Sequence, residues 1–313
     1  MQAVIETSKL TKKFGDLIAV DKLTLSVNKG EVLSFLGPNG AGKTTTIRML
    51  AGVIAPTSGE ARVAGILLNK ELEGLHECIG LLTENPGFYE RLTAAENLNF
   101  FARFYPGIDV NAQVSKYFAL MGLTDRANDK VGRYSKGMKQ RLALARAMLH
   151  EPRILFLDEP TAGLDPEAAR EVRELIRQLK SQGRTIFLCT HNLEEAEELS
   201  DRIALFNTML IALDKSKNLR RRLFDREVVV ELETLNERIL KSVRMRAYVK
   251  DAVEKSGKLA VKLLDFDKNR PLLIEAIVKA GGKVKSFYEA EHSLEEVYLS
   301  LMEESKDTKD GSR

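Results

Sequence analysis

A glycine-rich octapeptide near the N-terminus limits the possible folds of this chain more than any other feature. It matches the pattern G-x-x-x-x-G-K-[ST] at every position, with the residues Gly37, Pro38, Asn39, Gly40, Ala41, Gly42, Lys43 and Thr44. The apolar run 32–36 precedes it, and residues 44–53 have a helix-forming sequence. A strand, a glycine turn and a helix N-terminus in this order direct backbone N–H groups at a phosphate. The motif therefore predicts a phosphate-binding loop over residues 37–44.

The side chains that close this loop are the types that phosphate chemistry uses. Lys43 is placed to reach the β- and γ-phosphates of a nucleotide, and Thr44 to ligate Mg²⁺ through its hydroxyl. The next residue, Thr45, is placed to contact the α-phosphate. We therefore expect a nucleoside triphosphate with Mg²⁺ at this loop.

A second apolar run, residues 154–157, ends in the carboxylates of Asp158 and Glu159. This run and the run 185–189 lack polar alternation, which predicts strands of a parallel sheet that are buried on both faces. A carboxylate at the end of such a strand can hold Mg²⁺, and this role fits Asp158. Glu159 would then face the γ-phosphate and polarise the attacking water as a general base.

The distribution of glycine predicts two domains. Of the 21 glycines, 17 precede residue 214, and the polar stretch 214–218 follows them. We expect a first domain over residues 1–218, a small α+β domain over 219–303 and a flexible tail over 304–313. Patterning in the second domain predicts strands at 228–232, 259–264 and 283–288, and helices at 271–280 and 293–302.

Charge and hydropathy limit the partners of the chain. Its 48 Lys and Arg against 45 Asp and Glu give a net charge of +3, which makes no electrostatic case for nucleic acid. No charge-free stretch reaches the ~18 apolar residues of a membrane-spanning helix. The start MQAVIETSKL has no secretory signal, so we expect a cytoplasmic chain. Cys78 and Cys189 lack metal-ligand spacing and are interpreted as buried apolar residues.

With the phosphate loop and the two carboxylates in place, further stretches resemble the ATP-binding subunit of ABC transporters. Residues 134–138 resemble the signature that this family writes L-S-G-G-Q. Ser135 and Gly137 match it, and the resemblance implies that they contact the γ-phosphate bound to the opposite subunit. Tyr134, Lys136 and Met138 depart from the family pattern, and Lys136 either adds a charge contact to that phosphate or points to solvent.

Three more positions extend the resemblance. Asp165 lies in Gly-Leu-Asp-Pro, which resembles the family's D-loop at the dimer interface. His191 resembles the switch histidine, which is placed to hydrogen-bond the γ-phosphate and to order the attacking water. Phe14 matches the aromatic residue that stacks on adenine, although a core phenylalanine is the alternative interpretation.

Glu84 stands where the family has the glutamine of its Q-loop. The resemblance implies that Glu84 offers a charged oxygen to Mg²⁺ and belongs to the ATP site. The following segment, residues 85–98, looks like that of type-two exporters, whose subunits often carry this glutamate. The resemblance covers residues 1–213 and, more weakly, the last hundred residues.

The resemblance implies an α/β fold of the P-loop NTPase type. It comprises a mixed, largely parallel sheet, an antiparallel β subdomain, a helical subdomain and the small C-terminal α+β domain. It further implies an ATPase that uses ATP and Mg²⁺ and powers export at the cytoplasmic face of a membrane. The partners are a separate membrane permease and a second ATPase subunit, either identical or a sibling chain. An importer subunit and a soluble ABC ATPase acting on ribosomes are the alternatives, and the cargo stays open.

Overall fold

The computed structural model describes residues 2–68, 72, 74–223, 226–290, 295–296 and 298–299. The chain forms two compact units, residues 1–215 and residues 216–313, and each is described by itself. The division between Lys215 and Ser216 lies three residues before the expected boundary, because helix α8 (Ser216–Leu223) belongs entirely to the second unit. No helix within the described ranges combines the length and the apolar character that crossing a membrane requires.

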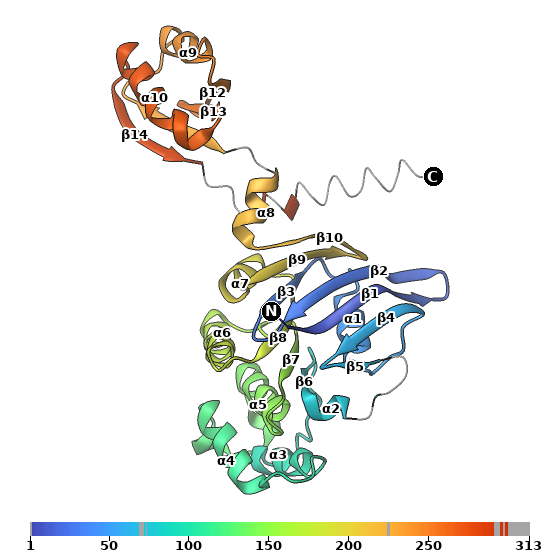
Figure 1. Ribbon diagram of the computed structural model, residues 1–313. Helices are drawn as coiled ribbons and strands as arrows, with labels where there is room; N and C mark the ends of the chain where they lie inside the picture. Colours follow the sequence, from blue (N-terminus) through green and yellow to red (C-terminus); the bar gives the residue numbers. More distant parts are fainter. Residues whose placement is uncertain are drawn as a thin grey trace. The chain divides into compact units, whose positions relative to one another are not determined.

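A six-stranded sheet forms the centre of the first unit (Figure 1). Its strands are β3 (Val32–Leu36), β6 (Ile79–Leu82), β7 (Ile154–Asp158), β8 (Thr185–Thr190), β9 (Arg202–Asn207) and β10 (Met209–Asp214). The order in space is β10-β9-β3-β8-β7-β6, with β10 antiparallel to β9 and the other neighbours parallel. Every residue of β3, β7 and β8 is buried, which confirms the interpretation of the three apolar runs.

Both faces of this sheet are covered. An antiparallel sheet with the order β2-β1-β4-β5 and helix α1 (Lys43–Leu50) share one apolar core with one face. The strands of this second sheet are β1 (Ala3–Phe14), β2 (Leu17–Asn28), β4 (Ser58–Val63) and β5 (Ile66–Leu67). The core on this side includes Phe35, Phe156 and Phe187, one aromatic residue from each of the three central strands. The glycine-rich loop 37–42 joins β3 of the central sheet to α1 on this side.

Helices cover the opposite face of the central sheet. They are α3 (Ala94–Ala102), α4 (Val110–Leu120), α5 (Lys136–Met148), α6 (Pro166–Ser181) and α7 (Leu193–Leu199). The short helix α2 (Leu75–Cys78) precedes β6 and packs Leu75 into the core on the α1 side instead. Two single 3₁₀ turns, Thr124–Arg126 and Val131–Arg133, join α4 to α5. Helix α6 buries Val172, Leu175, Ile176 and Leu179, as its periodicity predicts. Helices α3, α4 and α5 pack together in the lower part of Figure 1.

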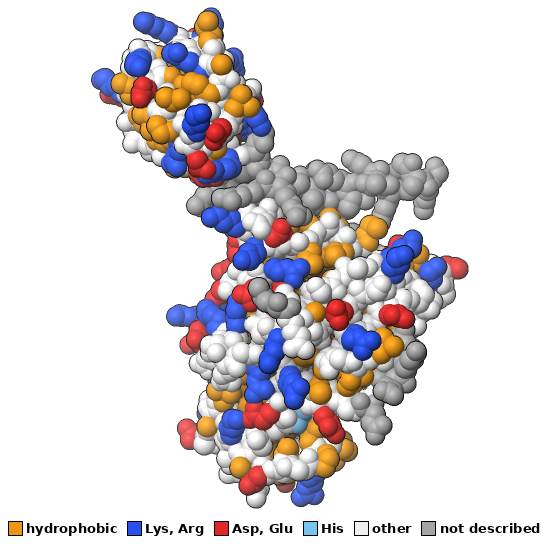
Figure 2. All heavy atoms as spheres, in the orientation of Figure 1, with side chains coloured by type: hydrophobic (Ala, Val, Ile, Leu, Met, Phe, Trp, Pro, Cys, Tyr) orange, Lys and Arg blue, Asp and Glu red, His pale blue; other side chains and the backbone are white. Residues whose placement is uncertain are grey.

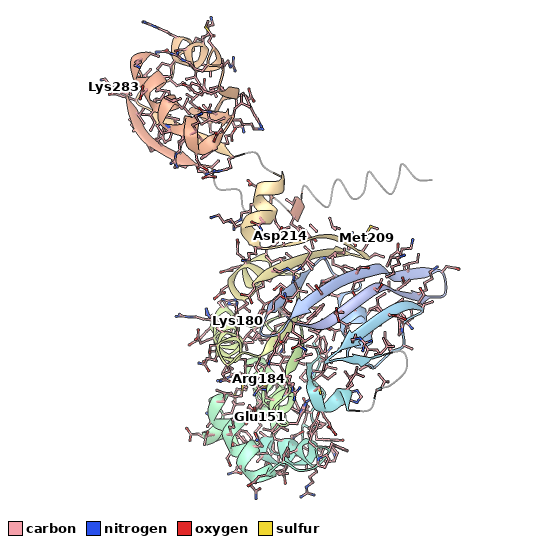
Figure 3. All side chains as sticks on the ribbon, in the orientation of Figure 1. Glu151, Lys180, Arg184, Met209, Asp214 and Lys283 are labelled. Carbon is pink, nitrogen blue, oxygen red and sulfur yellow. The ribbon has the colours of Figure 1, made fainter. Side chains whose placement is uncertain are left out.

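Polar contacts tie the amino ends of the central strands together. Arg184, directly before β8, forms an ion pair with Glu151, which precedes β7 (Figure 3). Lys180, at the end of α6, lies 2.7 Å from a carboxylate oxygen of Asp201. Met209 and Asp214 mark the two ends of the edge strand β10 in the same view.

The two cysteines differ in burial. Cys189 is buried, whereas Cys78 is only half-buried, so the interpretation as a buried residue is wrong for Cys78.

The second unit contains a four-stranded antiparallel sheet with the order β12-β13-β11-β14. Its elements are β11 (Glu227–Leu232), α9 (Glu237–Arg244), β12 (Val249–Lys255), β13 (Lys258–Leu263), α10 (Phe266–Lys279) and β14 (Val284–Glu289). The sequence of elements and the strand order are those of the split β-α-β-β-α-β motif. The predicted helix 293–302 lies outside the described residues, apart from 295–296 and 298–299.

Helix α10 begins five residues before the predicted start at Pro271. Pro271 is the sixth residue of α10, beyond the first turn, and it removes the one hydrogen bond that an N–H at this position would give to the carbonyl oxygen of Asp267. The buried ring of Phe266 anchors the extra turn in the core of the second unit. The proline is therefore not the start signal that the sequence indicated.

Candidate active site

The phosphate-binding loop lies at the carboxyl end of β3, where the chain turns into α1. Gly42 has a φ of 97°, and a Cβ there would lie 2.1 Å from the carbonyl oxygen of Ala19. A Cβ at Gly37 would lie 2.0 Å from the carbonyl oxygen of Phe206. Only glycine fits both positions, so these two glycines are required by the packing of the loop against β2 and β9.

The ammonium group of Lys43 is held inside the curl of this loop. Lys43 Nζ donates hydrogen bonds to the carbonyl oxygens of Gly37, at 2.8 Å, and Pro38, at 3.0 Å. It also lies 3.2 Å from Oε1 of Glu159, and the residue is only 5% exposed. A buried cation at the start of a helix is well placed to meet the charge of a phosphate chain.

Asp158 ends β7 beside the loop and is 2% exposed. Burial raises the pKa of this carboxyl group, while a hydrogen bond from Thr44 acts in the opposite direction. Its Oδ1 atom is buried and has no hydrogen-bond partner among the described residues. A buried carboxylate oxygen without a partner, next to a hydroxyl, fits Mg²⁺, which takes few protein ligands and completes its shell with phosphates and water. The described residues contain no group of three or more His, Cys, Asp and Glu suited to hold a metal.

Glu159 and His191 form a pair at the ends of two neighbouring strands. Nδ1 of His191 lies 2.8 Å from Oε2 of Glu159, and the carboxylate can only accept this hydrogen bond, so Nδ1 carries the proton. Glu159 has a φ of 50°, and its N–H donates to the carbonyl oxygen of Cys189 at 2.9 Å. A residue other than glycine in this left-handed region is held there by its surroundings, which is common where a side chain must be aimed.

Lys43, Glu159 and His191 line one cavity of about 570 Å³, and Asp158 is buried behind its lining. Its walls include the sequence-predicted residues Phe14, Asn39, Gly40, Ala41, Gly42, Lys43, Thr44, Thr45, Glu84, Glu159 and His191. Phe14 is 51% exposed at the end of β1, so it is not a core residue. Gly37 and Pro38 are not in the lining, and they contribute the carbonyl groups that hold Lys43.

The lining also contains apolar residues that the motifs do not reveal. Leu17 and Ile18 begin β2 beside Phe14, and both are unusually exposed for their type. A sequence signal could have identified Leu17 and Ile18 as lining residues, because they form an apolar pair directly after the tight turn of an antiparallel hairpin. Together with Phe14 they give one end of the cavity an apolar wall suited to a flat base.

The signature-like residues lie outside this cavity. Ser135 is the N-cap of α5 and accepts a hydrogen bond from the N–H of Met138 at 3.2 Å. Gly137 packs so closely on α6 that a Cβ there would lie 2.8 Å from Cβ of Ala168. Asp165 caps α6. The lining of the cavity includes none of these four residues, Ser135, Lys136, Gly137 and Asp165.

Lys136 extends toward the segment before Asp165. A Cβ built on Gly163 would lie 2.3 Å from Lys136 Nζ, so this ammonium lies directly against the backbone of Gly163. The side chain is exposed, and it bridges the signature-like turn and the D-loop-like turn of the same chain. The structure thus adds a neighbour that neither sequence interpretation of Lys136 included.

A glycine-rich loop around a buried lysine, with two carboxylates and a histidine facing it from adjacent strands, defines a P-loop ATPase. The family model described as "ABC transporter" matches residues 20–162. The uncharacterized ABC transporter ATP-binding protein YhcH of Bacillus subtilis is 34% identical over 311 residues, covering 98% of this chain and 98% of that protein. The chain belongs to the family of ABC transporter ATP-binding proteins and is an ATPase.

Other relatives match mainly the first unit. The bacitracin transport ATP-binding protein BcrA of Bacillus licheniformis is 45% identical over 208 residues, or 66% of this chain and 68% of that protein. The fluoroquinolones export ATP-binding protein MT2762 of Mycobacterium tuberculosis is 42% identical over 214 residues, or 68% and 70%. Among solved structures, the dimeric cassette MJ0796 with ADP and Pi has a TM-score of 0.61 at 27% identity, covering 67% of this chain and 98% of that one.

Proposed function

We propose that this chain is the ATP-hydrolysing subunit of an exporter, which closes on a second ATPase subunit around ATP and drives a separate membrane permease. The observation that carries the proposal is the split between the cavity and the signature-like residues. Ser135, Lys136 and Gly137 lie at the exposed start of α5, outside the cavity that holds the phosphate-binding loop. A second subunit turned head to tail would bring such a turn to each loop and complete two sites.

Within one site, each side chain has a role that its position supports. Lys43 binds the β- and γ-phosphates, and Thr45 contacts the α-phosphate. Thr44, Asp158 and Glu84 would hold Mg²⁺, which neutralises charge on the phosphate oxygens when it is bound. Phe14 stacks on the adenine ring at the apolar end of the cavity.

The water that attacks the γ-phosphate is handled by the pair of side chains on β7 and β8. Glu159 accepts the proton of the water as general base, and His191 keeps that carboxylate in place through its hydrogen bond. Across the interface, Ser135, Lys136 and Gly137 stabilise the γ-phosphate from the second subunit, aided by the dipole of α5. Asp165 lies at the same interface, two residues beyond the glycine that Lys136 contacts.

An exposed aromatic surface formed by α3 and the segments on either side of it supports the permease as a partner. Tyr89, Phe100 and Phe104 are 51%, 40% and 66% exposed, and the ring of Phe100 on α3 contacts each of the other two edge to face. Hydrophobic side chains are visible over this lower part of the first unit in Figure 2. Contiguous exposed aromatic residues mark sites where another protein docks. Glu84 lines the ATP cavity only five residues before Tyr89, so one short segment joins the two sites.

The names of two relatives support the proposed direction of transport. These two are named for bacitracin transport and fluoroquinolone export. Their similarity supports export over import and over a role on ribosomes, and we propose that the chain acts at the cytoplasmic face of the membrane. The permease, rather than this chain, would select the cargo.

A pull-down tests the proposal. A tagged Glu159→Gln chain with MgATP is bound to membranes solubilised in mild detergent, and the co-purifying proteins are identified. We expect a polytopic membrane protein in stoichiometric yield. The variant Phe100→Ser/Phe104→Ser, which changes only exposed side chains, should lose that protein and still bind ATP. Recovery of ribosomal proteins without a membrane protein would contradict the transporter function.

A further inference from the structure

The fully buried carboxyl group of Glu195 contacts the segments that carry Glu159 and His191, outside the cavity. Glu195 is the third residue of α7 and is 0% exposed. Its Oε1 accepts a hydrogen bond from the hydroxyl of Thr161 at 2.8 Å, and the hydroxyl of Thr190 interacts with the same carboxyl group. Thr161 follows Glu159 by two residues, and Thr190 directly precedes His191. One carboxyl group therefore contacts both segments that carry the pair.

The cap of α7 explains why this side chain is available. A glutamate at the third helical position commonly bonds back to the N–H of the N-cap residue. Here Thr190 Oγ1 accepts from the N–H of Asn192, the N-cap, at 3.0 Å. Asn192 in turn caps the N–H of Glu195 at 3.1 Å. The carboxyl group of Glu195 is thus released from the helix end and directed toward β7.

The packing of α7 could be satisfied by an apolar side chain at position 195, so it does not explain the presence of a carboxyl group there. Burial raises the pKa of Glu195 above its ordinary value, and Oε2 is buried with no hydrogen-bond partner among the described residues. Leaving a polar atom in that state is unfavourable, and an apolar residue of similar size would avoid it. Such a residue would give no acceptor to the hydroxyl of Thr161.

We propose that Glu195 is a positioning residue. Its carboxyl group links the segment of Thr161 to the segment of Thr190, outside the cavity, and so fixes Glu159 and His191 relative to each other. This inference rests on the roles proposed above for Glu159 and His191. The left-handed conformation of Glu159 needs such a restraint, since the backbone would otherwise relax to a commoner region. The 2.8 Å contact between His191 and Glu159 spans the same two segments on the cavity side. The two segments are therefore joined twice, by the Glu159–His191 contact in the cavity and by Glu195 outside it.

The test compares Glu195→Ala with Glu195→Gln by steady-state ATP hydrolysis of the full chain. Glu195→Gln keeps a carbonyl oxygen for the hydroxyl of Thr161 and has the same shape. We expect Glu195→Ala to lower kcat on the order of 10- to 100-fold with KM for ATP changed less than about threefold, because misplaced reacting groups slow the chemical step. Glu195→Gln should restore kcat to within about threefold of wild type, because the acceptor is retained.

Two further variants separate this role from a general loss of structure. Thr161→Val removes one donor without a change of shape, and it should reproduce part of the loss. Combined with Glu195→Ala it should add little, because both changes break the same hydrogen bond. Glu194→Ala, an exposed neighbour on α7, is the matched control and should behave as wild type.

The outcomes are distinct. Wild-type kcat in both Glu195→Ala and Thr161→Val would overturn the inference. So would a loss of ATP binding in Glu195→Ala together with normal turnover in Thr161→Val, because that pattern indicates a purely structural residue. Glu159→Gln is assayed in parallel: if it hydrolyses ATP normally, the proposed role of Glu159 fails, whatever the Glu195 variants do.

Discussion

The ammonium of Lys43 contacts two carbonyl oxygens and one carboxylate, and the residue is almost fully buried from solvent. Charge-assisted hydrogen bonds from such a group to phosphate are about twice as strong as neutral ones. We therefore expect Lys43→Ala to weaken ATP binding by about 10- to 100-fold, measured as the Kd in titration calorimetry. Lys13→Ala, which removes an exposed ammonium from β1, is the control and should leave the Kd unchanged. An unchanged Kd in Lys43→Ala would contradict the role of the loop.

Glu159 can be tested by a change of one atom. Glu159→Gln keeps the shape and still accepts a hydrogen bond from His191, but an amide cannot take a proton from water. We expect hydrolysis to fall by about 100-fold or more while ATP stays bound, so that a dimer accumulates with MgATP. Phosphate release measures the first effect, and light scattering after size-exclusion chromatography measures the second. Turnover within threefold of wild type would remove Glu159 from the role of base.

Sequence reasoning finds residues whose roles are encoded in a local pattern. Gly42, Lys43 and Thr44 are consecutive, and Asp158 and Glu159 are adjacent, so a short window reveals each group. Glu195 is different, because it acts on Thr161, 34 residues away in the chain. The two meet only because β7 and β8 are neighbours in the sheet, and no local pattern contains that information.

At the scale of elements, the caps connect stability with the proposed interface. Asp165 Oδ1 accepts a hydrogen bond from the N–H of Ala168 at 2.9 Å and so caps α6, which begins at Pro166. Asp165→Ala should lower the free energy of unfolding by about 1 kcal/mol in urea denaturation, and Asp165→Asn should not, because asparagine caps equally well. If the two variants had equal stability, the capping bond would contribute nothing measurable.

The elements of the first unit are easier to predict than those of the second. Strands β3, β7 and β8 are buried on both faces, so their sequences are uninterrupted apolar runs. Strand β12 alternates irregularly because it is an edge strand with mostly exposed residues, and the sequence does not identify it. Helix α9 is short and bears only two fully buried side chains, Ile239 and Val243, which is too few for a clear helical period.

For the whole molecule, the decisive question is whether one chain completes a site. The cavity contains the phosphate-binding loop, both ends of the Glu159–His191 pair and Glu84. Its lining includes no residue of the signature-like turn, which lies at the exposed start of α5. A site that needs this turn must therefore take it from another subunit, and the dimeric state of the related cassette MJ0796 is consistent with such an arrangement.

Mixing two inactive variants tests this composite site. Ser135→Asp keeps an N-cap for α5 and places a negative charge where the γ-phosphate of the second subunit would lie. Glu159→Gln leaves the signature-like turn intact. Each variant alone should be inactive, whereas a mixed dimer has one site with an intact loop, an intact base and an intact turn. If the chains are mixed in equal amounts before ATP is added, half of the dimers are mixed and half of their sites are active. Phosphate release should then recover to about a quarter of the wild-type rate. A mixture as inactive as its components would show that the turn of one subunit does not serve the loop of the other.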